Sequence, residues 1–401
     1  MKLSVACNFD PALLEGIKPY PVHEVYGKLS RDVAGGGRPT FTLPSVGKRR
    51  LAAYVALTRR AGLDFNYLLN ASCFNNLEYT RAGQRRIRQL LDWLAEIGVA
   101  ALTLNHPMLL RTVKRDYDFR IRIGVFAQVN SVQRAKFWVD EGADGICLDD
   151  ISCNRDFPLL RGLRQAVKCD LQLLVNNACF MGCHMSPMHM NMAAHASQSG
   201  HGSKGFYLDY CTIRCTAAKV EAPVNFIRAS WIRPEDLIHY QELGIDNFKI
   251  VERSCPTPML LTRVKAYSEG RYDGNLLDLI MSNSRRENSP RKLLAMLGTF
   301  ARPWLVNPIK MLLVRRFARE YDRMGAGDRV VVINNRELDC FLKPFLAESC
   351  RDKDCDACRY CHDVANRVVR IDEGFRQEFG DTVAPLVTAL EKGGMWRYGK
   401  D

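Results

Sequence analysis

The chain has 401 residues, of which 47% are hydrophobic and 25% charged, a composition typical of folded globular proteins rather than disordered ones. Its first residues do not form a secretory signal, and no run of about 18 apolar residues occurs, so we expect a cytoplasmic protein without a membrane-spanning helix. The net charge of +13 favours an acidic partner, which can be nucleic acid, anionic lipid or a carboxylate-bearing metabolite.

Short apolar strands alternate with helices over roughly the first 275 residues, the usual size of a closed (β/α)8 barrel. Segments 59–70, 96–105, 141–150 and 242–253 each end a helix on glycine and then begin an apolar strand. Gly62, Gly98, Gly142 and Gly244 suit a helix end that needs positive φ. Runs 4–9, 23–29, 122–128 and 171–177 complete a set of buried parallel strands. We therefore predict a (β/α)8 barrel; an open doubly wound sheet is the alternative, although neither GxGxxG nor a P-loop occurs.

Polar side chains stand at the ends of these predicted strands, where a barrel places its active site. The strand-end residues are Asn8, Asn70, Asn105, Gln128, Asp149, Asn177 and Glu252. We take Asn70, Asn105, Asp149, Asn177 and Glu252 as catalytic candidates. The alternative is that some of them only cap the next helix, because Asp and Asn are common N-caps.

A long insertion between the seventh and eighth strands carries Cys179-x3-Cys183 and Cys211-x3-Cys215. The chain has 15 cysteines, and a reducing compartment makes metal ligation the better interpretation of closely spaced ones. Four thiolates in two like-spaced pairs favour a 4Fe-4S cluster over zinc, and either over plain buried thiols. The histidines and methionines between the pairs allow copper, but packing is the favoured interpretation for them.

The chain resembles the U32 peptidase, or collagenase-like, family. The resemblance rests on IRPEDLIHYQELGIDNFKIVERSCPTPMLLTRVKAY (232–267), on the cysteine loop after LVNN (174–177) and on Gly-Ala-Asp-Gly-Ile at 142–146, and it covers about residues 1–275. It implies a barrel with a four-cysteine 4Fe-4S cluster. It also implies oxygen-independent hydroxylation, which better understood branches perform on a ubiquinone precursor, ribosomal RNA or transfer RNA, with prephenate as the apparent oxygen source.

Under this hydroxylase interpretation, a dicarboxylate donor would be held by Lys249, Arg253 and Arg228, and Arg253 would also belong to the catalytic centre. Arginine suits this role because its guanidinium group can donate two parallel hydrogen bonds to one carboxylate. The alternative is that these cations are surface charges or pair with Glu252 or Asp149. Proteolysis has no independent support, since neither HExxH nor GxSxG occurs and no Cys/His set has assignable roles.

The pattern changes after residue 275, and we divide the rest into 276–335 and 336–401. Residues 282–292 form a polar linker. Segment 291–319 is basic and amphipathic, carries no acidic residue and is interrupted by Pro303 and Pro308. It either docks on the barrel, which we favour, or lies peripherally in a membrane interface. RNA contact is a third interpretation, although an aromatic stacking surface is lacking.

The C-terminal region 336–401 contains a second group of cysteines, Cys350-x4-Cys355-x2-Cys358-x2-Cys361. Four thiols this close resemble cluster-binding segments of ferredoxins, so the spacing predicts a second iron-sulfur centre or a zinc site.

Three functions follow for this chain. The first is an iron-sulfur-dependent, oxygen-independent hydroxylase of a small or lipid-like molecule. The second is an RNA-modifying hydroxylase on the same scaffold, suggested by the net charge. The third is a non-catalytic electron-transfer subunit that pairs with another family member. A U32-type peptidase is the inherited alternative.

Overall fold

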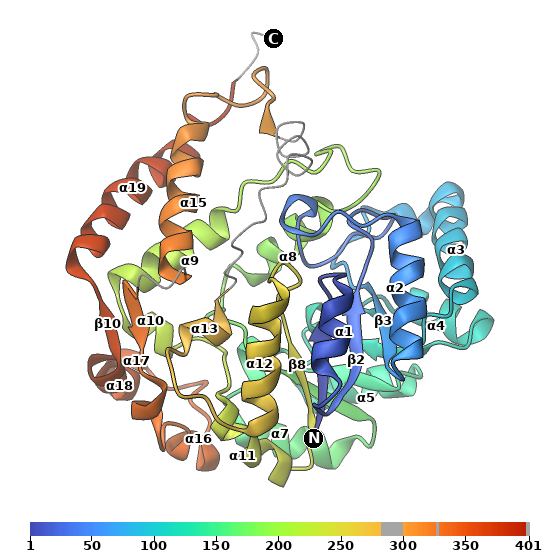
Figure 1. The fold of residues 1–401 in the computed structure, drawn as a ribbon, viewed down its shortest axis with the longest axis horizontal. Coiled ribbons are helices and arrows are strands. Elements are labelled where there is room, and N and C mark those ends of the chain that lie inside the picture. Colours follow the sequence, from blue (N-terminus) through green and yellow to red (C-terminus); the bar gives the residue numbers. More distant parts are fainter. Residues whose placement is uncertain (282–299, 326–328, 398–401) are drawn as a thin grey trace.

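The fold is a closed barrel of eight parallel strands, seen in a computed structural model that describes residues 1–281, 300–325 and 329–397 (Figure 1). Each strand pairs with the next in sequence, and β8 closes the ring against β1. The strands are β1 (Lys2–Ala6), β2 (Val22–Gly27), β3 (Asp64–Leu69), β4 (Ala101–Leu104), β5 (Arg120–Ile123), β6 (Gly145–Cys147), β7 (Asp170–Leu174) and β8 (Asn247–Ile250). The predicted (β/α)8 barrel is confirmed, and the open sheet is wrong.

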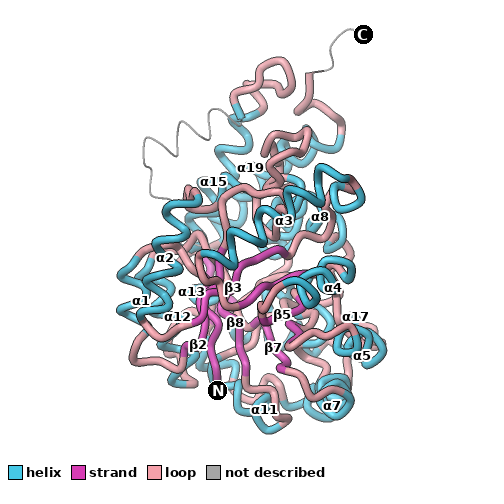
Figure 2. Tube along the Cα trace, turned by 90° about the vertical axis from the view of Figure 1, so that its right-hand side faces the viewer, coloured by secondary structure: helices cyan, strands magenta, loops and turns pink. Residues whose placement is uncertain are grey.

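Helices enclose the strands on all sides of the ring (Figure 2). They are α1 (Pro11–Ile17), α2 (Lys48–Arg60), α3 (Arg81–Glu96), α4 (Pro107–Asp116), α5 (Val132–Asp140), α6 (Asp150–Cys153), α7 (Phe157–Ala166), α11 (Leu237–Glu242) and α12 (Thr257–Glu269). Helix α3 shows why they form. Thr80 caps its first turn by accepting from the Gly83 amide at 3.0 Å, and Ile87, Leu91 and Leu94 repeat at helical spacing on the buried face.

The four predicted glycine helix ends all have positive φ, at 73° for Gly62, 79° for Gly98, 99° for Gly142 and 79° for Gly244. Each lets a helix stop and the next strand start within a few residues, because glycine takes this conformation without a Cβ clash. At Gly98 a Cβ would also lie 2.5 Å from the Arg59 guanidinium. These short turns fix where each strand begins, and hence where its carboxyl end meets the mouth.

The insertion between β7 and β8 holds α8 (Ser186–His195), α9 (Tyr210–Glu221) and α10 (Val224–Ile227). It lies against the carboxyl ends of the strands. The Gly182 amide donates to the Ile151 carbonyl at 2.8 Å, just after β6, and Gln198 forms an isolated bridge with Asp32 in the loop after β2. The insertion therefore covers the mouth of the barrel, as expected for a cysteine-bearing insertion before the last strand.

The C-terminal region packs on the insertion and on the barrel's outer helices. Its elements are α13 (Leu277–Ile280), α15 (Met311–Gly325), β9 (Val331–Ile333), α16 (Lys343–Ala347), α17 (Cys355–Cys358), α18 (Tyr360–Val368), β10 (Val369–Ile371) and α19 (Glu373–Glu391). Helix α19 packs on α9 and α15, α18 on α10, and α16 on α7. Both ribbon views place α15 and α19 at the end opposite the N-terminus, which is the side of the mouth (Figures 1 and 2).

Much of the predicted linker and the start of the basic segment, residues 282–299, lie outside the described residues. From residue 300 onward the basic segment is partly docked, because Phe317 is buried and its ring lies 6.1 Å from that of Phe379 on α19. Within the described parts of the chain, no helix has both the length and the apolar character that crossing a bilayer requires.

A buried ion pair holds the loop between β2 and α2 over the mouth. Asp32 lies 2.9 Å from Lys28, accepts from the Tyr67 hydroxyl at 2.6 Å, and accepts from the amides of Ala34 and Gly35 at 3.0 and 2.8 Å. Both charges are almost fully buried, so removing one partner leaves the other uncompensated.

We predict that Asp32→Asn lowers the free energy of unfolding by about 3 kcal/mol or more, because Lys28 stays buried without its carboxylate. Urea unfolding followed by circular dichroism measures the change. The matched control is Glu15→Gln, which removes an exposed pair with Lys18 at 2.5 Å and should leave the midpoint almost unchanged. Equal losses in the two variants would contradict the buried-pair argument.

Candidate active site at the barrel mouth

Two of the predicted asparagines, at the ends of β3 and β4, lie together at the mouth. The Asn105 amide donates to the Asn70 carbonyl at 2.7 Å. Among the described residues, the side-chain oxygens of both are buried without a hydrogen-bond partner. A buried acceptor without a partner costs free energy, so these two oxygens are available to a bound molecule.

Two other strand-end residues have local roles. The Asn8 amide donates to the Cys255 carbonyl at 3.2 Å and to the Thr257 hydroxyl at 3.0 Å, and so ties β1 to the start of α12. Gln128 ends a short 3-10 turn at a φ of 50°, and its carbonyl accepts from Arg134 at 2.7 Å.

The end of β6 carries two acids with different surroundings. Asp149 accepts from the Ser152 hydroxyl at 2.6 Å, and burial raises its pKa. Asp150, which the sequence analysis did not single out, accepts from the Asn177 amide at 2.9 Å and from the Ser230 hydroxyl at 2.6 Å. Burial, with a smaller effect from Asp149, raises the pKa of Asp150 to about 6. Asn177 thus acts on the site through Asp150, which titrates near neutral pH.

Glu252 lies at the end of β8 in a strained backbone conformation, with a φ of 99°. Its carboxylate accepts from the Ser254 hydroxyl at 2.6 Å and from Arg38 at 3.2 Å.

Arg38 comes from the loop after β2 and is a further residue that the sequence analysis missed. The available signal was the preceding run Gly35-Gly36-Gly37, since a Cβ on Gly36 would lie 3.1 Å from the Asn70 side-chain oxygen. The charge of Glu252 raises the pKa of Arg38, and weaker effects on it come from Cys179 and Asp209. Arg38 therefore lies between the mouth and the cysteine loop.

Lys249 and Arg253 are buried cations without a carboxylate at ion-pair distance among the described residues, although Glu24 acts on Lys249 and Glu252 acts on Arg253 from further away. The two cations are 7% and 6% exposed, and within the described parts of the chain neither side chain has a hydrogen bond or an ion pair. The Lys249 ammonium lies 4.2 Å from the centre of the Tyr26 ring, and burial lowers the pKa of both side chains. Since an uncompensated buried cation is costly, the pair is suited to bind an anion.

Arg228, the third cation assigned to the donor, is placed elsewhere. Its guanidinium lies 3.5 Å from His362 and 3.7 Å from Asp356, so it faces the C-terminal region. The structure thus brings Lys249 and Arg253 together and separates Arg228 from them.

The four insertion cysteines lie close enough to act electrostatically on one another. Cys179 and Cys183 flank a turn after β7, while Cys211 and Cys215 share one face of α9. All four are free thiols. Burial raises the pKa of Cys179 and of Cys211 to about 12, so the metal-free thiols stay protonated and ligation would release protons.

Lys219, one turn beyond Cys215 on α9, provides a positive charge beside this group. Its ammonium donates to the Ala178 carbonyl at 2.6 Å and lies 4.9 Å from the centre of the Phe180 ring. Its charge opposes the raised pKa of Cys179 and of Cys215. A cation in this position favours thiolates, the form of cysteine that binds metals.

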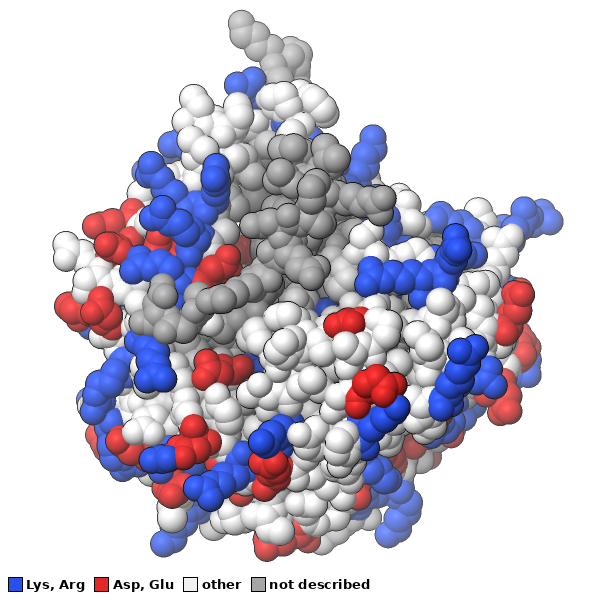
Figure 3. Space-filling view, in the orientation of Figure 1, with Lys and Arg blue, Asp and Glu red and all other residues white. Residues whose placement is uncertain are grey.

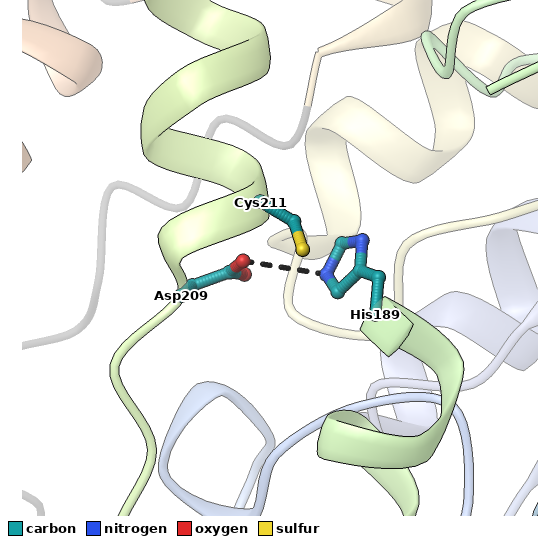
Figure 4. A group of neighbouring side chains, drawn as sticks. All are labelled: His189, Asp209 and Cys211. Carbon is teal, nitrogen blue, oxygen red and sulfur yellow. Dashed lines mark ion pairs between the residues drawn. The ribbon is translucent and has the colours of Figure 1, made fainter. Parts of the chain in front are cut away.

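His189, Asp209 and Cys211 converge between α8 and the start of α9 (Figure 4). His189 Nε2 lies 3.4 Å from an Asp209 oxygen, and one ligand atom from each of the three residues lies within 4.8 Å of the others. Burial alone would raise the pKa of Asp209, but the interaction with His189 and the hydrogen bonds from Thr212 together outweigh burial and hold that pKa below its usual range. The sequence analysis missed Asp209 and treated His189 as packing. The trio could hold one metal ion and shares Cys211 with the four-cysteine group.

An apolar cavity of about 510 Å³ lies beside the cysteine loop. Its lining includes Met192, His195, Phe206, Tyr207, Leu208 and Trp396. The cavity thus joins α8 and the 201–208 loop to the end of the C-terminal region, and its lining suits an apolar ligand.

The chain is similar to Uncharacterized protease MJ1657 of Methanocaldococcus jannaschii, with 27% identity over 340 residues that cover 85% of this chain and 87% of that protein. No family model matches it. Among solved structures it is similar to the U32 peptidase Mk0906, at 17% identity and a TM-score of 0.47, covering 63% of this chain and 92% of that one. FabK from Thermotoga maritima gives 12% identity and a TM-score of 0.33, covering 98% and 94%. At these values the barrel assignment rests on the strand pairing of the chain itself.

We predict that Asp150 makes stability fall as pH rises. Because the pKa of Asp150 is raised from 3.8 to about 6 in the folded chain, the folded state binds more protons than the unfolded state between these values. Asp150→Asn should therefore gain stability over the wild type between pH 4 and 6, by up to about 3 kcal/mol above that window. Unfolding curves of both proteins from pH 3.5 to 8 measure the difference. A difference that is constant with pH would contradict the raised pKa.

Proposed function

We propose that this chain is a U32-family enzyme that hydroxylates a small or lipid-like molecule without molecular oxygen, using an iron-sulfur cluster and prephenate as the oxygen donor. The observation that carries the proposal is the unpaired cation pair Lys249 and Arg253, buried at a barrel mouth that a four-cysteine insertion covers. The family assignment is supported by the resemblance over 232–267 and by the curated relative, which matches most of the chain.

The insertion cysteines fit a 4Fe-4S cluster held by Cys179, Cys183, Cys211 and Cys215. When bound, such a cluster supplies one-electron transfer. Among the described residues, no three of these sulfurs lie within 4.8 Å of one another, whereas tetrahedral zinc with bonds of about 2.3 Å would hold them roughly 4 Å apart. The preference for the cluster over zinc rests on the family resemblance and on the two like-spaced pairs of cysteines.

The cation pair fits a dicarboxylate, the chemical class of prephenate. Arg253 can donate two parallel hydrogen bonds to one carboxylate, and Lys249 can supply a point charge to the other. Arg38 is already paired with Glu252, so its charge is matched and it does not compete for the anion. The unsatisfied oxygens of Asn70 and Asn105 would accept from hydroxyl groups of a bound molecule.

The apolar cavity beside the cysteine loop supports a small or lipid-like acceptor over RNA. A nucleic-acid substrate would need a polar, basic channel with exposed aromatic stacking positions, whereas the lining of this cavity is mainly apolar. RNA hydroxylation and a role as a non-catalytic electron-transfer subunit are the competing proposals on the same scaffold.

Peptidase activity is the other competing proposal, suggested by the name of the curated relative. Its best nucleophile would be Cys211, with His189 as base and Asp209 orienting the imidazole. However, burial raises the pKa of the Cys211 thiol to about 12, whereas nucleophilic cysteines have a lowered pKa. The raised value counts against a nucleophilic role for Cys211.

Two variants measured in two assays test the proposal. We predict that Arg253→Gln weakens prephenate binding at least about tenfold, since the buried fork contributes a charge-assisted bond, and leaves iron and sulfide unchanged. Cys183→Ser should lose iron and sulfide. Calorimetric titration with prephenate measures binding, and metal analysis of anaerobically purified protein measures iron and sulfide. The control is Arg120→Gln, which changes an exposed arginine paired with Asp64. Prephenate binding that survives Arg253→Gln would contradict the donor site, and Cys183→Ser with full iron would contradict the cluster.

A further inference from the structure

The C-terminal cysteines lie on a stretch that has almost no core of its own. Residues 351–359 are all exposed and contain only the four-residue helix α17. Their ends are nevertheless held. The Tyr360 hydroxyl donates to the Phe341 carbonyl at 2.9 Å, and the Ser349 hydroxyl donates to Asp156, which caps α7, at 2.8 Å. An exposed stretch with anchored ends and several free thiols is suited to stabilisation by a ligand common to those thiols.

Arg155 lies beneath this stretch as a buried charge without a carboxylate partner. It is 2% exposed, and its guanidinium carbon lies 4.6 and 4.7 Å from the centres of the Trp231 and Phe341 rings. One nitrogen donates to the Ile227 carbonyl at 2.5 Å. Among the described residues, its Nε and Nη2 have no partner. Of the ionisable groups that act on it, the Cys361 thiol acts most strongly, followed by Tyr240 and Cys350.

Arg228 provides a second cation near Cys361. Its side chain is 25% exposed and lies 3.5 Å from His362 and 3.7 Å from Asp356, the neighbours of Cys361 and Cys355. Its Nε is also buried without a partner among the described residues. Two guanidinium groups thus lie near the C-terminal thiols.

We propose that Cys350, Cys355, Cys358 and Cys361 hold a thiolate-ligated metal centre, separate from the barrel insertion, whose negative charge is balanced by Arg155 and Arg228. Four thiolates outweigh the charge of a zinc ion or of an oxidised 4Fe-4S core, so the centre is anionic in either case. This charge would satisfy Arg155, which otherwise has no carboxylate partner, and would add to the pairing of Arg228 with Asp356 at 3.7 Å. The sequence spacing Cys-x4-Cys-x2-Cys-x2-Cys allows either metal. Among the described residues no three of these sulfurs lie within 4.8 Å of one another, so metal binding would have to draw this exposed stretch together.

Metal analysis of the anaerobically purified full chain tests the site. Cys358→Ser should lose part of the metal that the wild type carries, and Cys340→Ser should lose none, because Cys340 is exposed and outside the set. Loss of iron and sulfide identifies a cluster, and loss of zinc identifies a zinc site. Comparison with Cys183→Ser separates this metal from that of the barrel insertion. Metal content that is the same in Cys358→Ser as in the wild type would overturn the proposal.

The charge-balancing role has its own readout, the rate at which a chelator removes the metal. Arg155→Leu should release the metal at least about tenfold faster than the wild type, and Arg155→Lys, which retains the charge, should lie closer to it. Since Arg155 is in the core, Arg228→Gln tests the same role from the surface, with thermal unfolding as the check on folding. Unchanged release rates in both Arg155→Leu and Arg228→Gln would overturn the role.

An independent observation concerns the basic segment. Four of the eight exposed large hydrophobic side chains of the described residues, Trp304, Leu305, Ile309 and Leu312, fall within nine consecutive positions. Trp304 is 73% and Ile309 74% exposed. The segment begins at the end of the molecule opposite the N-terminus, and on the face shown Lys and Arg side chains gather over α15 (Figures 1 and 3).

From these features we infer that residues 302–316 bind the surface of an anionic lipid bilayer. Lys310, Arg315 and Arg316 are exposed beside the apolar residues, and the segment has no acidic residue, which is the charge pattern of an interfacial anchor. Val306 pairs with Trp396, which lines the apolar cavity. The bound bilayer would therefore lie beside the cavity proposed for a lipid-like substrate.

Vesicle co-sedimentation tests this surface. The chain should bind phosphatidylserine-containing vesicles and lose binding to pure phosphatidylcholine or at high salt. The double variant Trp304→Ser with Ile309→Ser should bind at least about tenfold more weakly. The control Ile238→Ser removes an apolar side chain that is 53% exposed on α11 and should bind as the wild type does. Absence of vesicle binding, or RNA binding that the double variant abolishes, would overturn the inference, and neither outcome bears on iron or prephenate binding.

Discussion

The need to pair every buried charge organises this molecule. Where the chain supplies a partner, the charge serves the fold. Asp32 pairs with Lys28 at the mouth, and Arg122 reaches Glu24 inside the barrel. There Arg122, with smaller effects from His23, Ser4 and Lys249, outweighs burial and holds the pKa of Glu24 at about 2. Arg233 pairs with Asp236 at 2.9 Å beside the C-terminal region. Lys249, Arg253 and Arg155 are buried to the same degree without such partners, and that contrast separates sites from scaffold.

The barrel makes this contrast possible because its frame is rigid and its mouth is assembled from separate loops. Interior polar residues satisfy one another near the strand starts, as when Asn66 accepts from Thr103 at 2.9 Å and Gln172 donates to Asn247 at 2.8 Å. The mouth receives Arg38 from the loop after β2, Asp150 from the end of β6 and Glu252 from the end of β8. Each comes from a different βα unit, so the chemistry there can vary without a change to the ring.

The sequence was sufficient for features with a local cause. Apolar runs with glycine helix ends located all eight strands, since Gly62, Gly98, Gly142 and Gly244 need positive φ whatever surrounds them. It was insufficient where a residue's role depends on a distant loop. Arg38 meets Glu252 across more than two hundred positions, and Asp209 meets His189 only because α8 and α9 pack at that angle. Arg228 was assigned to the donor site for its charge, but the turn after α10 directs it toward His362.

Arg228, in the insertion, contacts both cysteine groups. The Met181 amide, between Cys179 and Cys183, donates to the Arg228 carbonyl at 2.9 Å, while the Arg228 side chain reaches His362 beside Cys361. One residue thus contacts the barrel's cysteine loop through its backbone and the C-terminal cysteines through its side chain. Helix α18 packs on α10, and α19 packs on α9, so the C-terminal region contacts both the helix that precedes Arg228 and the helix that carries Cys211 and Cys215. Closely packed elements hold one another in place because the interior has few voids, so the insertion that covers the mouth also positions the anchored ends of the C-terminal cysteine stretch.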